Sequence, residues 1–296
     1  MLRKPPAVRP GDRVAIIAPA GPFDRASFDA GLAVLEGRYQ VQYDTGLFDR
    51  FRYLAGDDSR RLDELRSALV DPAIQAIFCA RGGYGTTRLI PHLEPFVAPK
   101  PLIGFSDITA LHLWMQQHGA VSIHGPVVTQ LGSQPEATRQ RLFALLESIS
   151  AAPPLHGTDT YVGGTAEGLL IGGNLAVLSR LLGTPYLPAF EGAILLLEDV
   201  GERPYRLDRM WTHLALAGIM RHVSGIVLGS FSACEERDAD YTSADVLRTL
   251  AEETGLPCAA GFPIGHGEIN ESVPLGVRVR LDADARRLEF LEACAR

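Results

Sequence analysis

The sequence predicts an α/β protein of two domains, the first carrying a doubly wound, mostly parallel sheet of the flavodoxin or Rossmann type. In the first half of the chain, short apolar runs alternate with segments of helical spacing, a pattern that favours right-handed crossovers within a parallel sheet. At about 149–165 the chain becomes rich in Ser, Ala, Pro, Gly and Thr, a composition typical of a domain boundary. We therefore predict a first domain over 1–150, a linker over 151–164 and a smaller α/β domain over 165–296.

The strands of the first domain are predicted from short apolar runs bounded by turn residues or charges. They are Val14–Ala18, Tyr39–Tyr43, Ile74–Ala80, Leu102–Phe105 and Val121–Ile123. Two helices are predicted between them, over 25–37 and over Asp57–Leu69, where apolar side chains recur every three or four residues. Because ligands of parallel α/β sheets gather at the carboxyl ends of the strands, we expect the functional residues there.

The second domain has its own apolar runs and helical segments. The predicted strands are Ala166–Ile171, Ala193–Leu197, Gly225–Leu228 and Cys258–Phe262, followed by an alternating, half-exposed hairpin over Gly276–Asp282 and Arg287–Leu291. The predicted helices are Leu175–Leu182, 204–217 and 243–253.

Composition excludes several classes of protein. The 296 residues carry a net charge of −7, which argues against a nucleic acid or an anionic membrane surface as the main partner. No apolar run approaches the roughly 20 residues of a membrane span, and the N-terminal run is too short for a signal-peptide core. The four cysteines show no paired spacing, so neither a zinc site nor a disulfide framework is indicated and no cofactor or metal is expected. A cytoplasmic setting follows.

Ser106 is the first candidate functional residue. It stands between a predicted buried strand and a predicted helix that begins at Asp107. The first N–H groups of a helix have no partner within it, so a serine at this joint is placed as a nucleophile whose oxyanion meets ready donors. The alternative is a helix cap, a role that serine often fills.

Two further features end neighbouring strands. Gly82, Gly83 and Gly85 form a loop whose backbone can approach a ligand closely and direct N–H groups at an anion, although a tight turn would need glycines too. The loop has neither the GxGxxG pattern nor the P-loop Lys, so a nucleotide site is rejected. His124 ends the next strand on the same edge, and a histidine there is more often structural than catalytic.

Glu198 and His266 are the candidate acid and base. Glu198 directly follows a run of four apolar residues, and charges in such places are usually paired or functional. The structural alternative is an ion pair with a nearby arginine. His266 stands between glycines after a predicted strand, where its ring is accessible, and the alternative is a surface loop histidine.

The ordered motifs of this chain resemble those of the LD-carboxypeptidase family of serine peptidases, the S66 type. The matching words are Arg81-Gly82-Gly83-Tyr84-Gly85, Gly104-Phe105-Ser106-Asp107-Ile108-Thr109, His124-Gly125-Pro126, Gly172-Gly173-Asn174-Leu175, Leu197-Glu198-Asp199-Val200-Gly201-Glu202, Pro204-Tyr205-Arg206 and Gly261-Phe262-Pro263-Ile264-Gly265-His266. Each word alone is weak, but their shared order over residues 80 to 266 is a strong signal. Ile108 stands where GxSxG has its second glycine, so the α/β-hydrolase fold is not supported.

The resemblance implies a Ser-Glu-His triad in a cleft between the two domains. Ser106 would be the nucleophile, His266 the general base, and Glu198 the acid that orients His266. The oxyanion would be bound by the backbone N–H groups of Asp107 and Gly83.

The resemblance also implies a substrate, a murein tetrapeptide that loses its terminal D-alanine during cytoplasmic cell-wall recycling. A charged rim is then expected, to bind a terminal carboxylate and an internal amine. The candidate binding residues are Arg81, Tyr84, Asn174, Glu202, Arg203 and Arg206, of which the arginines would bind the carboxylate and Glu202 the amine. A homodimer is expected, in part through the apolar positions of the 204–217 helix.

Two other functions remain open from the sequence. One is the self-immunity branch of the same family, which cleaves an aminoacyl–nucleotide antibiotic; its members resemble this chain in the triad words but tend to have longer insertions. The other is a binding protein of two α/β domains that holds a small ligand without chemistry.

Overall fold

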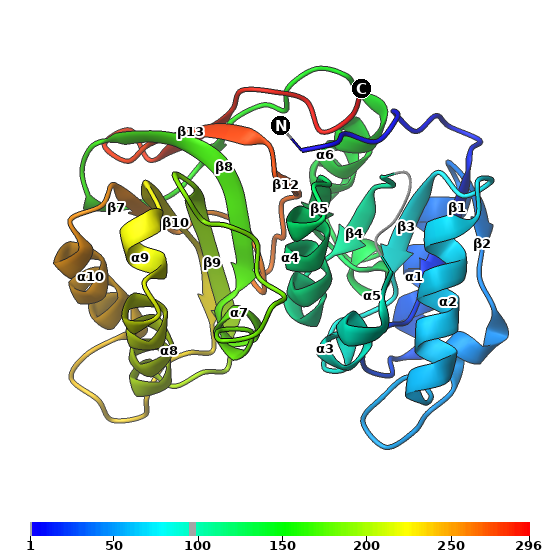
Figure 1. Ribbon diagram of the computed structural model, residues 1–296, viewed down its shortest axis with the longest axis horizontal. Helices are drawn as coiled ribbons and strands as arrows, with labels where there is room; N and C mark the ends of the chain where they lie inside the picture. Colours follow the sequence, from blue (N-terminus) through cyan, green and yellow to red (C-terminus); the bar gives the residue numbers. More distant parts are fainter. Residues whose placement is uncertain (1, 95–98) are drawn as a thin grey trace.

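A computed structural model describes residues 2–94 and 99–296 of the chain, and Figure 1 shows its two halves side by side. The N-terminal half holds a six-stranded sheet in the order β12-β5-β4-β3-β1-β2, and the C-terminal half an eight-stranded sheet in the order β6-β14-β13-β8-β9-β10-β11-β7. The predicted class is confirmed: the protein is α/β, with a parallel-rich first sheet and a second, curled sheet.

The first sheet is parallel except at one edge. Its strands are β1 (Arg13–Ile17), β2 (Gln40–Gln42), β3 (Ala76–Cys79), β4 (Leu102–Gly104), β5 (Ser122–His124) and β12 (Val273–Leu275). All pairs among β1 to β5 are parallel, whereas β12 runs antiparallel to β5. The edge strand β12 therefore comes from the far end of the chain.

The first two helices of this half begin where the sequence supplies a capping aspartate. They are α1 (Arg25–Glu36), α2 (Asp58–Val70), α3 (Thr86–Leu89), α4 (Thr109–Gln117), α5 (Val128–Leu131) and α6 (Glu136–Glu147), with 3-10 turns at Thr45–Phe48, Ile90–His92 and Ser106–Ile108. Asp24 caps α1 by accepting from the Ser27 N–H, and Asp57 caps α2 in the same way.

The second sheet is mixed. Its strands are β6 (Leu155–His156), β7 (Asp159–Val162), β8 (Thr165–Asn174), β9 (Ile194–Val200), β10 (Gly225–Ser232), β11 (Cys258–Ala260), β13 (Arg278–Asp282) and β14 (Arg287–Phe290). Strands β8 to β11 pair in parallel, and the outer strands pair antiparallel. The helices are α7 (Leu175–Arg180), α8 (Pro204–Leu216), α9 (Ile219–His222) and α10 (Ser243–Thr254).

Three features differ from the simple two-domain expectation. Within the predicted linker 151–164, β6 and β7 already belong to the second sheet. Strand β12 lies within the predicted second domain 165–296 but completes the first sheet. Strand β9 runs past its apolar run to Val200, so Glu198 lies inside the strand rather than after it. The domain boundary itself stays a prediction.

Both faces of the first sheet are buried, as a parallel sheet requires. Val14 and Ile16 of β1 enter one apolar cluster, while Ala15 and Ile17 enter another, because successive side chains of a strand point to opposite faces. Each cluster also includes strand residues of the second sheet. The two halves therefore share a continuous core.

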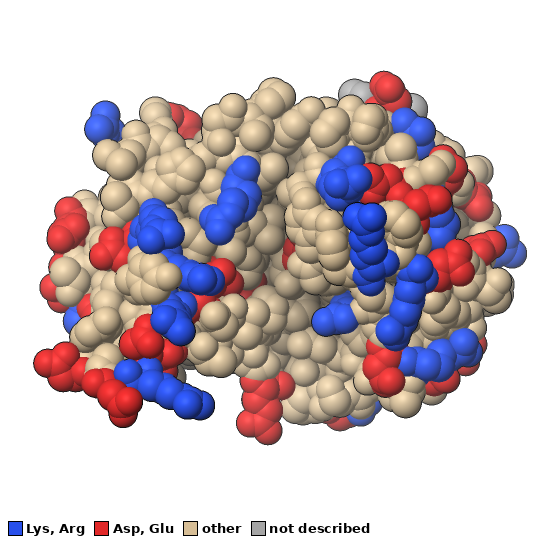
Figure 2. All heavy atoms as spheres, turned by 90° about the horizontal axis from the view of Figure 1, so that it is seen from below, with Lys and Arg blue, Asp and Glu red and all other residues tan. Residues whose placement is uncertain are grey.

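The carboxyl ends of the central strands face the same side in both halves. In Figure 1, α3 and α7, which follow β3 and β8, both lie on the lower side of the molecule. Figure 2 looks at that side and shows a furrow between the halves, with basic side chains on both flanks. Among residues 2–94 and 99–296, no helix is long and apolar enough to cross a bilayer.

Candidate active site

Ser106 lies where β4 passes into the 3-10 turn Ser106–Ile108. Its backbone is left-handed, with a φ of 64°. A non-glycine residue in this conformation carries a strain of about 1–3 kcal/mol, and such residues cluster at functional sites. A serine on a strained turn between strand and helix is the arrangement called a nucleophile elbow. Phe105 takes the cap position of the turn, so Ser106 does not serve as its N-cap.

The glycine loop after β3 lies directly against this serine. A Cβ added to Gly82 would lie 2.7 Å from the Ser106 Cβ and 3.0 Å from its Oγ. On its other side the loop packs on Gly21, whose N–H donates to the Gly82 carbonyl at 3.0 Å. Gly83 has a φ of 109°, which favours glycine. Glycines are therefore needed here so that one backbone can approach the serine of another segment.

Asp107 ties the glycine loop to the serine turn. Its carboxylate accepts a hydrogen bond from the Thr86 N–H at 2.8 Å, and the Thr86 hydroxyl donates to the Asp107 carbonyl at 2.6 Å. Both residues are buried. These bonds fix the backbone of Asp107, whose N–H the sequence predicts as an oxyanion donor, beside the loop that carries Gly83.

Glu198 and His266, 68 residues apart in the chain, are joined by a hydrogen bond. The Nδ1 of His266 donates to the Oε2 of Glu198 at 2.6 Å, which leaves Nε2 to accept a proton. The His266 ring also packs on Phe105, with 4.6 Å between ring centroids. Since Phe105 immediately precedes Ser106, the imidazole stands beside the serine turn.

The arginines near Glu198 in sequence have other partners. Arg203 forms an ion pair with Glu236 at 3.7 Å, and Arg206 forms one with Glu202 at 3.4 Å. Glu198 is fully buried and faces histidines instead. The structural alternative of an arginine ion pair is therefore not what the fold adopts.

The pKa values of two adjacent carboxyl groups of β9, those of Glu198 and Asp199, are shifted in opposite directions. Burial alone would raise the pKa of Glu198, but the imidazoles of His124 and His266 beside it lower it, to about 2. Burial raises the pKa of Asp199 to about 6, and the charge of Glu198 adds to this rise, against hydrogen bonds from Val200, Asn174 and Ala176. The acid that contacts His266 is therefore the one kept ionised.

The segment after His266 is anchored on the N-terminal half. Gly265 donates its N–H to the Asn270 side chain at 2.9 Å, and the Asn270 N–H donates to Gln134 at 2.9 Å. The chain then enters β12, where Val273 lies opposite His124. Tertiary contacts of the first half thus hold the predicted base, although its sequence position lies in the second.

The exposed candidates for substrate binding lie on three segments. The Arg81 side chain donates to the Pro22 carbonyl. Tyr84 is 47% exposed, and its ring lies 5.9 Å from that of Tyr53. Glu202 and Arg206 line a pocket of about 310 Å³ at the start of α8. The remaining lining residues of this pocket are Arg180, Tyr205, Arg209 and Met210.

Asn174 has a structural set of partners. It is 4% exposed, its side-chain oxygen accepts from the Val177 N–H as the cap of α7, and its amide donates to Asp199. Its own N–H donates to the hydroxyl of Thr109, at the start of α4, at 2.9 Å. These bonds connect β8 with the helix that follows Ser106.

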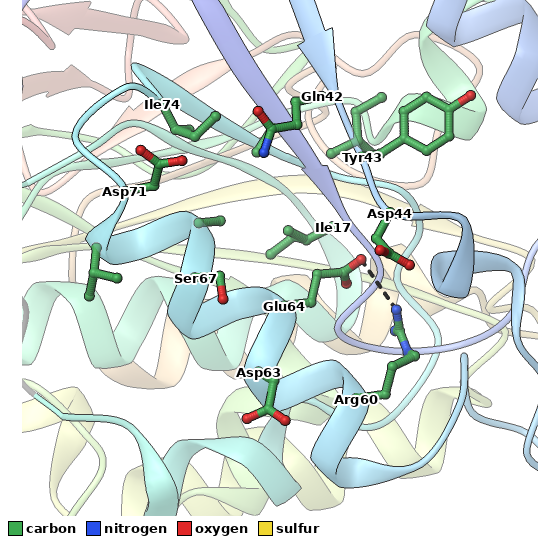
Figure 3. A pocket seen from close by; sticks show the side chains of 14 residues that line it. Ile17, Gln42, Tyr43, Asp44, Arg60, Asp63, Glu64, Ser67, Asp71 and Ile74 are labelled. Atoms are coloured by element: carbon green, nitrogen blue, oxygen red, sulfur yellow. Dashed lines mark ion pairs between the residues drawn. The ribbon is translucent and has the colours of Figure 1, made fainter.

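A cavity with a volume of about 660 Å³ lies elsewhere, beside β1, β2 and α2 (Figure 3). Its charged lining includes Asp44, Asp63 and Asp71, together with an ion pair between Arg60 and Glu64 at 3.2 Å. None of Ser106, Glu198 and His266 lines it. Cavity size alone therefore does not locate the site of this molecule.

Sequence reasoning missed the residues that hold the site together. Gln134 and Asn270 lie in loops outside helices and strands, and no spacing rule marks them. The three glycines within four positions did mark the loop beside Ser106, and Gly82 is the one that lies against this serine. In the described part of the chain, no group of three or more His, Cys, Asp or Glu is arranged to hold a metal ion.

Comparison with known families gives two matches. The model of the LD-carboxypeptidase N-terminal domain matches residues 14–125, and that of the LD-carboxypeptidase C-terminal domain matches residues 167–281. Together they cover most of the chain, including the segments that carry Ser106, Glu198 and His266.

Individual relatives match over nearly the whole length. A protein of Pseudomonas aeruginosa named murein tetrapeptide carboxypeptidase is 38% identical over 93% of this chain and 94% of its own. The crystal structure of muramoyltetrapeptide carboxypeptidase from Oxalobacter formigenes superposes with a TM-score of 0.83 at 29% identity, over 94% of this chain and 97% of that one. The structure of MccF in complex with glutamyl sulfamoyl guanosine gives a TM-score of 0.90 at 21% identity, over 99% of both chains. At that identity, the last match shows a shared fold.

Proposed function

Since the chain belongs to the LD-carboxypeptidase family and is a serine-type enzyme of that family, we propose that it releases the terminal D-alanine of murein tetrapeptides by a Ser106-His266-Glu198 triad. The observation that carries this proposal is the 2.6 Å hydrogen bond between His266 and Glu198 beside the serine turn. Membership of an enzyme family argues against a protein that only binds its ligand.

The proposed chemistry follows from the placement of three groups. The Nε2 of His266 takes the proton of the Ser106 hydroxyl as Oγ attacks the carbonyl carbon before the terminal D-alanine. The oxyanion is bound by the N–H groups of Asp107 and Gly83. His266 then gives its proton to the leaving amine, and water hydrolyses the acyl-enzyme by the same route. Glu198, ionised and buried, holds the imidazole in the tautomer that the first step needs.

The pocket at the start of α8 supports a role in substrate binding. Three guanidinium groups, those of Arg180, Arg206 and Arg209, line it against the single carboxylate of Glu202. We propose that Arg206 binds a carboxylate of the substrate and Glu202 its amine, with Arg81, Tyr84 and Arg203 on the outer rim. Asn174 would act indirectly, by connecting β8 to α4.

A substitution of Arg206 tests this assignment. Arg206→Ala should raise KM for tetrapeptide by about 10-fold or more, because a charge-assisted hydrogen bond of about 1.5–3 kcal/mol is lost. The value of kcat should change little, since the residue does not touch the reacting bond. Arg280→Ala removes an exposed arginine of β13 and serves as the control. An unchanged KM in Arg206→Ala would contradict the assignment.

The triad is tested by measuring D-alanine release from murein tetrapeptide by chromatography. Ser106→Ala should abolish release, because no other group in the proposal can form the acyl-enzyme. Ser133→Ala, at an exposed serine, is the matched control and should keep wild-type activity. Retained turnover in Ser106→Ala would refute the mechanism.

A second candidate substrate is an aminoacyl–nucleotide amide. It is favoured by the similarity of fold to MccF, whose structure contains glutamyl sulfamoyl guanosine. The same assay with an aminoacyl sulfamoyl adenylate separates the two: preferential cleavage of that compound would assign the chain to self-immunity rather than to cell-wall recycling.

We also propose a cytoplasmic homodimer. All four cysteines are free and buried, which fits a reducing compartment. On α8, Leu216 is 81% exposed, an apolar surface that a second copy could cover. Light scattering of the purified protein measures the mass directly, and a monomeric mass at micromolar concentration would rule out the dimer.

A further inference from the structure

His124 lies on the far side of the Glu198 carboxylate from His266. It ends β5, in the interior of the first sheet between β4 and β12, and is fully buried. Its Nε2 is 3.9 Å from the Oε1 of Glu198, while the Nδ1 of His266 contacts Oε2. A single buried carboxylate therefore stands between two imidazoles.

The facing atoms of this pair have no other partner within residues 2–94 and 99–296. Neither ring nitrogen of His124 makes a hydrogen bond there, and neither does the Oε1 of Glu198. Buried polar atoms are almost always satisfied, and exceptions in native proteins often mark a functional role. The Nε2 of His124 and the Oε1 of Glu198 are thus both unsatisfied and lie 3.9 Å apart.

Two other polar residues near this pair already have hydrogen-bond partners. His112 of α4 lies 6.3 Å from the His124 ring, but its nitrogens contact the Ser122 hydroxyl and the Gly104 carbonyl, each at 2.9 Å. Burial lowers the pKa of His112 to about 3, so this ring is neutral. Asp199, the next residue along β9, accepts from three donors, those of Asn174, Ala176 and Val200. The Oγ of Ser272, which precedes the Val273 that pairs with His124, is also buried without a hydrogen-bond partner, but it carries no charge. Glu198 is thus the charged group beside His124, at 3.9 Å.

We propose that His124 is a positioning residue of this active site, donating its Nε2–H to the Oε1 of Glu198 so that Oε2 stays directed at His266. A hydrogen bond needs about 2.9 Å between the two atoms, so they must approach by roughly 1 Å. Such bonds are often long in unliganded enzymes and tighten when substrate binds. The inference rests on the proposed triad and adds a second imidazole beside its carboxylate.

Loss of the Nε2–H donor of His124 should change the pH dependence of activity, whereas a mere loss of packing around this ring would not. With Oε1 unpaired, the Glu198 carboxylate is less stabilised, so the Glu198–His266 pair takes up a proton more readily. The acid limb of the pH profile of kcat/KM reports that protonation in the free enzyme. We therefore expect the limb to move to higher pH, by about one unit for the loss of one hydrogen bond.

The experiment compares His124→Gln with His124→Asn. The side-chain amide nitrogen of Gln can occupy the position of Nε2, whereas that of Asn corresponds to Nδ1, on the other side of the ring. His124→Asn should lower kcat for tetrapeptide by about 10- to 100-fold, the usual effect of losing a supporting partner, and should shift the acid limb. His124→Gln should restore most of kcat and a wild-type limb.

His112→Gln is the matched control, at a buried histidine beside His124 whose ring nitrogens contact the Ser122 hydroxyl and the Gly104 carbonyl. It should lower the melting temperature without moving the acid limb. If His124→Asn keeps the wild-type limb, or if Gln and Asn at position 124 behave alike, His124 has only a packing role. Ser106→Ala is measured in parallel: an inactive Ser106→Ala beside normal His124 variants would overturn this inference and leave the proposed function intact.

Discussion

Glu198 and Asp199 are neighbours on one strand, yet the pKa of Glu198 is lowered and that of Asp199 is raised. Their side chains point to opposite faces of β9, so Glu198 meets two imidazoles while Asp199 meets backbone N–H groups and an amide. Both are nearly inaccessible, with exposures of 0% and 2%. What separates their pKa values is therefore the partner that each side chain finds, not the depth of burial.

Asp199 should make stability depend on pH. Its pKa is raised from 3.8 to about 6, so between these values the folded state holds a proton that the unfolded state has lost, and stability falls as pH rises. The slope from one such group is at most about 1.4 kcal/mol per pH unit. Asp199→Asn should flatten this part of the curve when the free energy of unfolding is measured in urea from pH 4.5 to 6.5.

Glu198 should not contribute to the pH dependence of stability between pH 4.5 and 6.5. Its pKa is lowered to about 2, so its contribution is present above its unfolded value and is lost only as pH falls below about 4.5. Equal slopes for wild type and Asp199→Asn would show that Asp199 is ionised throughout the window.

At the scale of elements, the segment between β11 and β13 decides where His266 lies. It leaves the second sheet, carries His266 past the serine turn and forms β12 on the first sheet before it returns. Gln134, in the turn between α5 and α6, contacts it twice: its oxygen accepts from the Asn270 N–H, and its nitrogen donates to the Glu268 carbonyl at 3.2 Å. The two hydrogen bonds of Gln134 therefore hold the segment that carries His266 against the first half.

Gln134→Ala should remove both hydrogen bonds to the segment that carries His266. We expect a loss of about 1–3 kcal/mol in unfolding free energy, because the buried Asn270 N–H loses its acceptor. We also expect a fall of about 10-fold in kcat, because small misplacements of a catalytic group lower the rate strongly. The measurements are urea unfolding and tetrapeptide turnover.

Gln140→Ala, on the exposed side of α6, is the control and should change neither quantity. A Gln134→Ala enzyme that loses stability but keeps its kcat would show that the loop is positioned by other contacts, such as the strand pairing of β12.

At the scale of the whole molecule, the two halves are not independent. Strand β12 from the C-terminal part completes the first sheet, and α4 of the first half packs on β8 of the second. Apolar clusters draw buried residues from both halves, for example Leu111 and Leu175 in one cluster and Ile123 and Leu170 in the other. The core is continuous, so the halves should fold together.

A fragment of residues 1–150 should therefore fail to fold stably. It lacks β12, which leaves β5 as an open edge, and it exposes the apolar surface that otherwise packs on the second half. The intact chain should unfold in a single transition. Circular dichroism and binding of an apolar dye measure both expectations. A soluble fragment with a cooperative transition of its own would show that the predicted boundary separates independent domains.

Several parts of the fold and site could be predicted from local pattern. The apolar runs that became β1, β3, β4 and β9 were visible because a strand buried on both faces must be apolar throughout. Ser106 was visible because it joins such a run to a helical segment. The exact ends of β8 and β9 could not be predicted, because glycines and acidic residues, which have low strand propensity, extend these two strands. Pairing between β8 and β9 holds these residues in the strand conformation.

The sequence by itself determined the α/β class, the serine turn, the glycine loop and the family motifs, because each of these depends on residues that lie close together along the chain. Only the tertiary structure decided that β12 crosses back to the first sheet, that Gln134 and Asn270 hold the loop of His266, and that His124 faces Glu198. These contacts join segments more than 70 residues apart, and hydrogen bonds between such segments leave no periodic trace in the chain.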